Sequence, residues 1–240
     1  MAIRVYNMLY VRIADTPAPV DDLTARARIR DAAIACFAES GFDATVRQIA
    51  ARAAVSPGLI THHFGSKEAL RSQCDDEVLR RILALKVETT KLSPSQSIGR
   101  IAQLDEYGSV LAYTLRSVRE GGEVGRAFLK SMIDDAREYV GAAVEAGMVL
   151  PSGDPEARLE LLVTQSIGGM LLQLTLRGDT DFADGATLIR ELTESTSFAL
   201  LELYTQGLLV DSTLLDEFVR QAPDLVPGFR QPNKVEQTNA

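Results

Sequence analysis

Apolar residues recur every three or four positions along most of the chain, which is the spacing of one face of an α-helix. Ile29, Ala33 and Phe37 follow one another at intervals of four and share such a face. The helix that carries them is expected to begin near residues 22–24 and to end before Gly41, because glycine readily adopts the left-handed conformation that closes a helix. The period-two alternation of strands is not sustained, so the pattern predicts an all-α protein.

Two short helices are expected next, joined by a tight turn. Thr45 is a typical N-cap for the first, because its hydroxyl accepts a hydrogen bond from a backbone N–H that the helix leaves unpaired. Ser56 is the corresponding cap of the second, and Pro57 takes the first helical position, where a missing N–H costs nothing. Two short helices in this arrangement form a helix-turn-helix.

The spacing inside this helix-turn-helix separates a buried side from an outward side. The small Ala50 falls where the two helices touch, and Ile49, Val55 and Ile60 close an internal core. The residues left to face outward are Pro57, Gly58, Thr61 and His62. Small outward residues allow a helix to approach a DNA groove closely, and the N–H groups at its start attract phosphate. The alternative is a helical hairpin that only forms part of a core.

The rest of the chain is also predicted to be helical. Five long helices are expected. The first runs from Ser66 to the segment before Pro94, a second ends at residues 121–123, and a third continues from there to about residue 147. The last two run from Asp154 to Gly178 and over residues 181–206. We assign the chain to four regions: a flexible N-terminal arm (1–21), a helix-turn-helix domain (22–73), a helical ligand-binding and dimerisation domain (74–222) and a flexible C-terminal tail (223–240).

The net charge of −8 by itself disfavours a polyanionic partner, but the charge is unevenly distributed. Residues 24–74 contain seven Lys and Arg against four Asp and Glu, whereas residues 75–240 contain 16 against 26. The helix-turn-helix segment is therefore able to approach DNA, while the remainder is repelled by it.

Composition argues against several other classes of protein. The chain has no tryptophan and 6% aromatic residues, which suits helices better than a sheet sandwich. No apolar run reaches the ~20 residues that span a bilayer, and the start lacks the apolar segment of a secretion signal. We expect a cytoplasmic protein with no membrane partner, in which Cys36 and Cys74 are reduced packing residues.

Both histidines of the chain, His62 and His63, lie in the outward helix. Adjacent residues on a helix point about 100° apart and rarely share a metal ion. General acid–base catalysis needs an orienting carboxylate, and Glu68 and Asp75 follow only on the next helix with no nucleophile nearby. We expect no metal site, no catalytic site and no cofactor.

The stretch from Ala27 to Arg80 resembles the DNA-binding domain of the TetR family of bacterial repressors. The matching segments are FAESGF, then ATVRQIAARAAVS, then SPGLITHHFGSKEAL. The resemblance implies a homodimer that reads two operator half-sites, each subunit placing its third helix in the major groove. It implies DNA contacts by the residues that match the family pattern: Thr45, Arg47, Ser56, Pro57, Gly58, Leu59, Thr61, His62, His63 and Lys67.

Three features depart from the family pattern. Thr61 stands where many members have a tyrosine that contacts phosphate, so this contact is expected to be shorter or absent. Ala54 occupies a turn position that is often glycine, and a left-handed alanine would cost ~1 kcal/mol. The loop before the second helix is one residue shorter than the usual form. Together these departures leave the base preference open.

The resemblance also implies that the last two long helices pair with their copies in a four-helix interface. Their apolar stripes are broad enough to require burial, and a glycine pair allows close backbone approach. The expected interface residues are Leu159, Leu162, Gly168, Gly169, Leu188, Leu192, Ala199 and Leu203. The alternative is that these stripes face the core of their own subunit.

A small-molecule effector is expected between residues 100 and 180. Side chains there that are bulky or polar could line a mostly apolar pocket: Tyr107, Tyr113, Phe128, Met132, Gln165, Met170 and Gln173. Ordinary core or surface positions are the alternative for each. The expected function is a transcriptional repressor released from its operator by a small, mostly apolar ligand. A dimeric scaffold or ligand-binding protein that has lost DNA binding and, less favoured, a helical enzyme are the rival functions.

Overall fold

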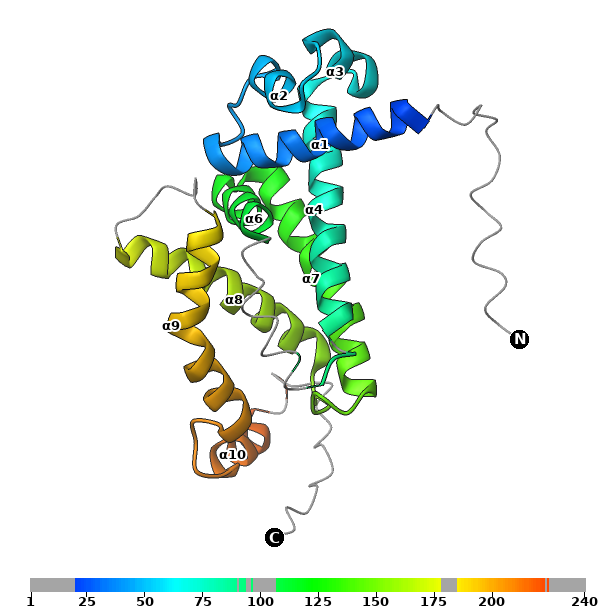
Figure 1. Cartoon of the computed structure of the whole chain (residues 1–240). Helices are drawn as coiled ribbons and strands as arrows, with labels where there is room; N and C mark the ends of the chain where they lie inside the picture. Colours follow the sequence, from blue (N-terminus) through cyan, green and yellow to red (C-terminus); the bar gives the residue numbers. More distant parts are fainter. Residues whose placement is uncertain are drawn as a thin grey trace, which may run out of the picture.

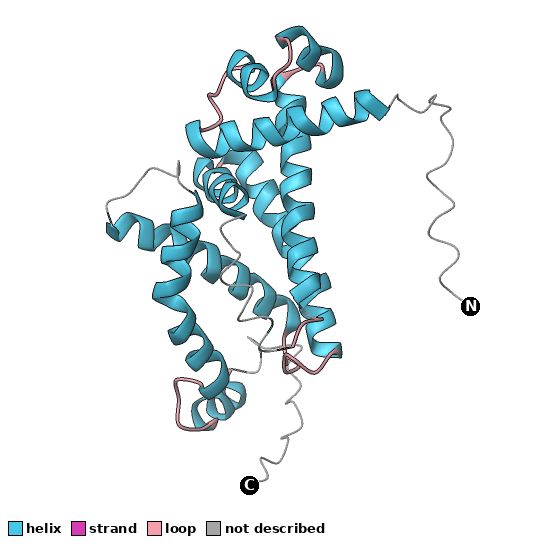
Figure 2. Cartoon of the chain, viewed as in Figure 1, coloured by secondary structure: helices cyan, strands magenta, loops and turns pink. Residues whose placement is uncertain are grey.

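A computed structural model describes residues 20–89, 91–93, 96, 107–177, 185–222 and 224 (Figure 1). Within this part of the chain every regular element is a helix (Figure 2), which confirms the all-α prediction. The helices are α1 (Val20–Ser40), α2 (Val46–Ala53), α3 (Pro57–Phe64), α4 (Lys67–Thr89), α6 (Gly108–Glu120), α7 (Gly122–Glu145), α8 (Pro155–Arg177), α9 (Gly185–Gln206) and α10 (Thr213–Gln221). Nearly all of the predicted arm and tail lies outside the described residues.

Three helices, α1 to α3, form a head at one end of the molecule (Figure 1). α4 runs from the head toward the other end, with α7 packed along it, and α6 packs beneath α1. α8 packs on α7, α9 packs on α6, and α10 lies at the end opposite the head. The predicted boundary between residues 73 and 74 falls inside the continuous helix α4.

An apolar core holds the head together. Phe37, Ile49, Ile60 and Leu70 come from α1, α2, α3 and α4, and each has at most 2% of its surface exposed. Ala50 is buried as well, which confirms that a small residue lies where α2 meets its neighbours. Burying each large side chain contributes about 1.5–3 kcal/mol, so the head is stabilised by residues of its own subunit.

α6 ties the head to the rest of the molecule. Arg116 donates hydrogen bonds to the carbonyl oxygens of Ala38 and Glu39, at 2.7 and 2.8 Å, at the C-terminal end of α1. The last carbonyls of a helix lack intrahelical partners, and a cation there also interacts favourably with the helix dipole. Arg116 of α6 therefore caps the C-terminal end of α1.

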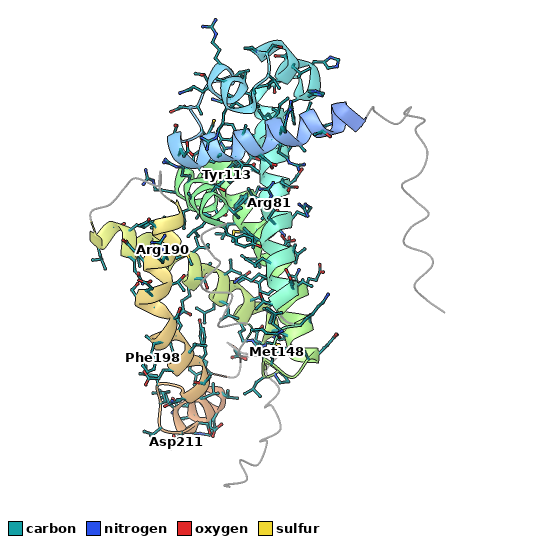
Figure 3. All side chains as sticks on the ribbon, viewed as in Figure 1. Arg81, Tyr113, Met148, Arg190, Phe198 and Asp211 are labelled. Atoms are coloured by element: carbon teal, nitrogen blue, oxygen red, sulfur yellow. The ribbon has the colours of Figure 1, made fainter. Side chains whose placement is uncertain are left out.

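Tyr113 of α6 is fully enclosed beneath α1 (Figure 3). Its hydroxyl donates a hydrogen bond to a carboxylate oxygen of Asp75 on α4 at 2.6 Å. Its ring centre lies 5.3 Å from that of Phe42 and 6.3 Å from that of Phe37. Burial raises the pKa of both Asp75 and Tyr113. One side chain thus links α6 to α1, to the loop after α1 and to α4.

Candidate functional site

Hydrogen bonds at the helix ends fix the helix-turn-helix. Thr45 Oγ1 accepts a hydrogen bond from the backbone N–H of Gln48 at 3.2 Å, and Gln48 Oε1 accepts one from the N–H of Thr45 at 2.7 Å. Ser56 Oγ accepts from the N–H of Leu59 at 3.3 Å, and Pro57 is the first residue of α3. Both predicted N-caps are confirmed.

The turn between α2 and α3 contains a left-handed alanine. Ala54 has φ 54° and ψ 48°, and it is the only non-glycine residue with positive φ in the described part of the chain. The turn therefore keeps the left-handed geometry although an alanine occupies it. The N–H of Val55 donates to the carbonyl of Ala50 at 3.0 Å, which closes the turn. The packed helices on both sides hold this residue in a conformation that costs an alanine about 1 kcal/mol.

α3 buries one side and exposes the other. Ile60 and Phe64 point into the head core with 2% and 6% of their surface exposed. Leu59 and His63 are half-buried at the edge of α3. The exposed residues are Ser56, Pro57, Gly58, Thr61 and His62. The predicted outward position of the small and polar residues is confirmed, while their contact with DNA stays a prediction.

Two cations flank the exposed side of α3. Arg47 is exposed on α2, and Lys67 is half-buried as the first residue of α4. Across the described ranges neither of them takes part in an ion pair. Ser66 Oγ accepts a hydrogen bond from the N–H of Ala69 at 3.1 Å, so the α4 terminus beside Lys67 is capped. Both cations therefore keep their charge available for an anion outside the subunit.

Two other cations, Arg30 on α1 and Arg71 on α4, are already neutralised. Arg71 pairs with Glu120 of α6 at 2.5 Å, and Arg30 lies 3.4 Å from Glu77. Both carboxylates belong to the acidic part of the chain, beyond residue 74. A charge count over the segment could not show this neutralisation, because folding brings the acidic partners in from outside it.

The histidines and cysteines have structural surroundings. The rings of His62 and His63 are 5.5 Å apart, centre to centre. A search of the described residues finds no cluster of three or more His, Cys, Asp or Glu side chains suited to a metal ion. Cys36 and Cys74 are free and buried, and burial raises the pKa of both thiols. A protonated, enclosed thiol is a poor nucleophile, so both behave as packing residues.

Three residues predicted for the dimer interface are buried within the subunit. Leu159, Leu188 and Leu192 have 4%, 6% and 3% of their surface exposed. These three side chains thus pack mainly within their own subunit and offer little surface to a second one, and their place in the interface stays a prediction. The remaining five positions are at least partly accessible: Leu162, Gly168, Gly169, Ala199 and Leu203.

A different set of apolar side chains faces outward from α8 and α9. Leu172 is 66% exposed, Leu176 86% and Phe198 78% (Phe198 is labelled in Figure 3), and Leu161, Leu201 and Tyr204 are also exposed. The segment Pro155–Leu176 is long and apolar enough to span a membrane by length and composition alone. Only 22% of its most apolar window is buried within the subunit, so most of this apolar helix is accessible to a partner. We call this surface the α8–α9 face.

The seven predicted pocket residues lie in different surroundings. Tyr113 and Phe128 are buried in the main core, with 0% and 4% exposed. The others range from core to surface: Met132 and Met170 are partly buried against the main core, Tyr107 and Gln173 are half-buried, and Gln165 is exposed. A pocket of about 220 Å³ at the α1–α6 contact is lined by none of them. The effector pocket stays a prediction.

Two sequence models of one family match the chain. "Bacterial regulatory proteins, tetR family" matches residues 29–74, and "Tetracyclin repressor-like, C-terminal domain" matches residues 105–210. The HTH-type transcriptional regulatory protein RaaS of Mycobacterium tuberculosis is 40% identical over 202 residues, which cover 84% of this chain and 94% of RaaS. The chain belongs to the TetR family.

Further TetR-family proteins are similar to the chain. The HTH-type transcriptional repressor Rv3405c of Mycobacterium tuberculosis is 33% identical over 170 residues, covering 70% of this chain and 79% of that protein. The structure of FadR from Bacillus subtilis in complex with stearoyl-CoA shares the fold, with a TM-score of 0.52 over 76% of this chain and 99% of FadR at 17% identity. The chain is thus a transcriptional regulator of the TetR family, whose members bind operator DNA and dimerise.

Proposed function

We propose that this TetR-family regulator is a homodimeric repressor. Two copies of α3 would enter the major groove at two half-sites of an operator, and a small, mostly apolar ligand would release the protein. The protein would act in the cytoplasm, where it reaches operator DNA. Its chemistry would be binding alone, with no catalysis.

The observation that carries the DNA-binding proposal is Gly58. Its φ is not in the left-handed region, and a Cβ built there would meet no atom closer than Ser56 Oγ, at 3.9 Å. Neither backbone conformation nor packing within the subunit therefore requires glycine. Glycine in a helix costs about 0.8–1 kcal/mol relative to alanine. A bare backbone at this position serves something outside the subunit, and close approach to a DNA groove is such a purpose.

The surroundings of α3 support phosphate contacts on both sides. Thr45 and Arg47 lie at the start of α2, and Lys67 lies at the start of α4. Exposed N–H groups and cations at helix starts are favourable partners of a phosphate. Thr61 has a shorter side chain than the tyrosine common in the family, so we expect Lys67 to carry more of the phosphate contact on its side.

Dimerisation is supported by the α8–α9 face. Large apolar side chains at 66–86% exposure are disfavoured in water unless a partner covers them. A second copy of the chain would bury them and place two α3 helices on one side of the dimer. A single recognition helix rarely provides enough affinity for an operator, which is a further reason for two copies.

The ligand would bind where α6, α7 and α8 approach one another. Phe128, Met132 and Met170 supply adaptable apolar contacts at this place. Tyr113 and Arg116 on α6 then connect such a site to α1 and α4. A ligand that binds better to one placement of α6 would shift the distance between the two heads of the dimer.

The DNA-binding proposal is tested by fluorescence anisotropy with a labelled duplex from the region upstream of the protein's own gene. We expect Gly58→Leu to raise the Kd at least tenfold without lowering the Tm, because the side chain has room in the free protein and clashes in the groove. Ala51→Leu, at an exposed site on α2, is the size-matched control.

Lys67→Ala tests the phosphate contact in the same assay. It should weaken binding and lower the slope of log Kd against log salt by about 0.9, which is the contribution of one phosphate contact. Lys130→Ala, at an exposed lysine on α7, should change neither value. Absence of binding to every upstream fragment at low salt, with a folded dimer, would instead favour a scaffold that has lost DNA binding.

A further inference from the structure

α10 is an amphipathic helix whose apolar side is left uncovered by the part of the chain that the structure describes. Leu214, Leu215 and Phe218 are 65%, 49% and 47% exposed, and no residue of α10 is buried. On the other side Arg220 forms an ion pair with Glu217. The polar side of α10 is thus satisfied within the helix, while the apolar side contacts mainly solvent.

A helix of this length does not persist through its own hydrogen bonds. α10 has nine residues, and isolated helices shorter than about 12–15 residues are marginally stable in water. Most helical stability in proteins comes from packing of the apolar side. α10 therefore needs a surface to pack on, and the described residues of its own subunit do not supply one.

The turn before α10 extends the exposed apolar surface. Gly207, with φ 75°, ends α9 and reverses the chain. Leu208 is 84% exposed, Leu209 59% and Val210 103%. Exposed apolar residues thus occur at the end of α9, in this turn and again in α10, separated by the short stretches 205–207 and 211–213. Exposed apolar surface of this extent marks an interaction site.

The charges of this segment decide among the possible partners. Residues 207–221 carry three acidic side chains, Asp211, Asp216 and Glu217, against one basic side chain, Arg220. Helices that lie on membranes carry Lys and Arg on the polar side, which attract anionic lipids. An acidic segment is repelled by such a surface, so a lipid membrane is disfavoured.

The position of the segment favours a second copy of the chain. α10 follows directly on α9, whose outward side belongs to the α8–α9 face, and it lies at the end opposite the head (Figures 1 and 3). In a two-fold dimer the same surface of both subunits meets, so an apolar patch continuous with the contact becomes part of it. The match to the family's C-terminal domain ends at residue 210, before α10 begins.

We infer, building on the homodimer proposed above, that residues 207–221 form a dimerisation arm. The apolar side of α10 packs on the second copy of the chain beside the α8–α9 contact, and this packing holds α10 in its helical form. The arm adds apolar contact at the end of the dimer away from DNA. It strengthens the dimer without touching the head or its DNA contacts.

Sedimentation equilibrium of the full chain tests the arm. The variant carries Leu214→Glu and Phe218→Glu, which place charge on the apolar side of α10. The matched control carries Thr213→Glu and Arg220→Gln, which make the same change in net charge at exposed positions on the polar side of α10. We expect the variant to raise the dimer Kd at least tenfold, as loss of two central apolar contacts does in other interfaces, and the control to stay within threefold of the wild type.

The outcomes separate the arm from the homodimer. A variant with wild-type Kd, alongside Phe198→Glu that separates the subunits, overturns the arm and leaves the homodimer intact. A wild-type chain that stays monomeric at every concentration overturns both. Loss of binding to anionic lipid vesicles in the variant, with an unchanged dimer Kd, assigns α10 to a membrane instead.

Hydrogen exchange supplies a second measurement that does not depend on any variant. Backbone amides of residues 213–221 should gain protection as the protein concentration rises through the dimer Kd, in parallel with those of α9. Exchange in α10 that stays fast at all concentrations overturns the arm. The free energy of unfolding of the head, measured at a concentration where the chain is monomeric, should be the same in wild type and variant.

Discussion

The head and the opposite end of the molecule differ in how far their apolar side chains are buried. In the head, Phe37 and Ile49 have no exposed surface, and helices of the same subunit cover them. On α9 and α10, Phe198 is 78% exposed and Leu214 65%. The head is therefore complete within one chain, whereas the far end of the molecule would be completed by the second copy in the homodimer that we propose. A DNA-reading unit must keep its shape when bound or free, while an interface need only form in the dimer.

The polar contacts of the two regions differ as well: those of the head reach other helices, whereas that of α10 stays within the helix. α6 lies outside the helix-turn-helix segment, yet Arg116 caps α1, Glu120 pairs with Arg71, and Tyr113 donates to Asp75. Residues beyond residue 73 therefore also hold the head in place. On α10, by contrast, the ion pair of Arg220 and Glu217 stays within the helix.

Alanine substitution of one phenylalanine at each end should give the largest contrast. Phe37→Ala should lower the free energy of unfolding by about 3–5 kcal/mol, because it leaves a cavity in a packed core. Phe198→Ala should change it by less than about 0.5 kcal/mol at concentrations where the chain is monomeric. Urea unfolding of both variants measures this. Equal losses would show that Phe198 is covered within its own subunit.

Glu77 should give the next largest effect. It is 6% exposed and lies 2.9 Å from Arg80 and 2.8 Å from Arg81, with Arg30 at 3.4 Å. Glu77→Gln should destabilise the chain by roughly 2–3 kcal/mol at pH 7, because three cations lose their shared anion. Exposed Glu123→Gln is the control, and urea unfolding is the measurement.

The effect of Glu77 should depend on pH. Hydrogen bonds from Arg80, with further contributions from Arg81 and Arg30, lower the pKa of Glu77 to about 2. A lowered pKa means that its stabilising effect is fully present above the ordinary pKa of about 4.5 and is lost as pH falls toward 2. The difference between wild type and Glu77→Gln should therefore shrink between pH 4.5 and 2. A constant difference across this range contradicts the role of the charge.

Arg116→Ala tests whether α6 belongs to the head. Loss of two hydrogen bonds from a cation to the end of α1 should cost about 1–3 kcal/mol. Hydrogen exchange should also become faster in the last turn of α1. Arg126→Ala, at an exposed position on α7, should leave both properties unchanged. If exchange in α1 does not change, α6 is only a neighbour of the head.

Ala54→Gly should give the smallest effect, and with the opposite sign. Glycine removes the left-handed strain of about 1 kcal/mol but adds freedom to the unfolded chain, so a net gain of roughly 0.5 kcal/mol is expected. Ala51→Gly, in the regular part of α2, should lose about 1 kcal/mol instead. Thermal unfolding of both variants measures these changes. A lower Tm for Ala54→Gly would show that the left-handed conformation of Ala54 costs less than the added freedom of the unfolded chain.

The elements that sequence predicted best are those with local signals. Thr45 and Ser56 cap helices through hydrogen bonds to residues three positions away, so the signal and the structure lie in the same few residues. α10 was not predicted, although Leu214, Leu215 and Phe218 recur at helical spacing. The segment is short and lies beyond the long apolar stripes.

The direction in which a helix faces is what the sequence leaves open. Leu188 and Leu192 carry an apolar stripe, and the stripe shows that burial is needed but does not show against what. Tyr113 was expected in a ligand pocket because it combines bulk with a polar group. It is instead enclosed beneath α1 and bonded to Asp75, a contact across 38 positions of sequence.

By itself the sequence determined the all-helical class, the helix-turn-helix with its caps, and the outward set of small residues on α3, because each depends on contacts between near neighbours. Only the tertiary structure decided which cations remain unpaired beside α3, how α6 completes the head, and which apolar residues of α8 to α10 stay exposed. Those features depend on residues far apart in sequence being brought together, and helical periodicity carries no information about the partner that a face will meet.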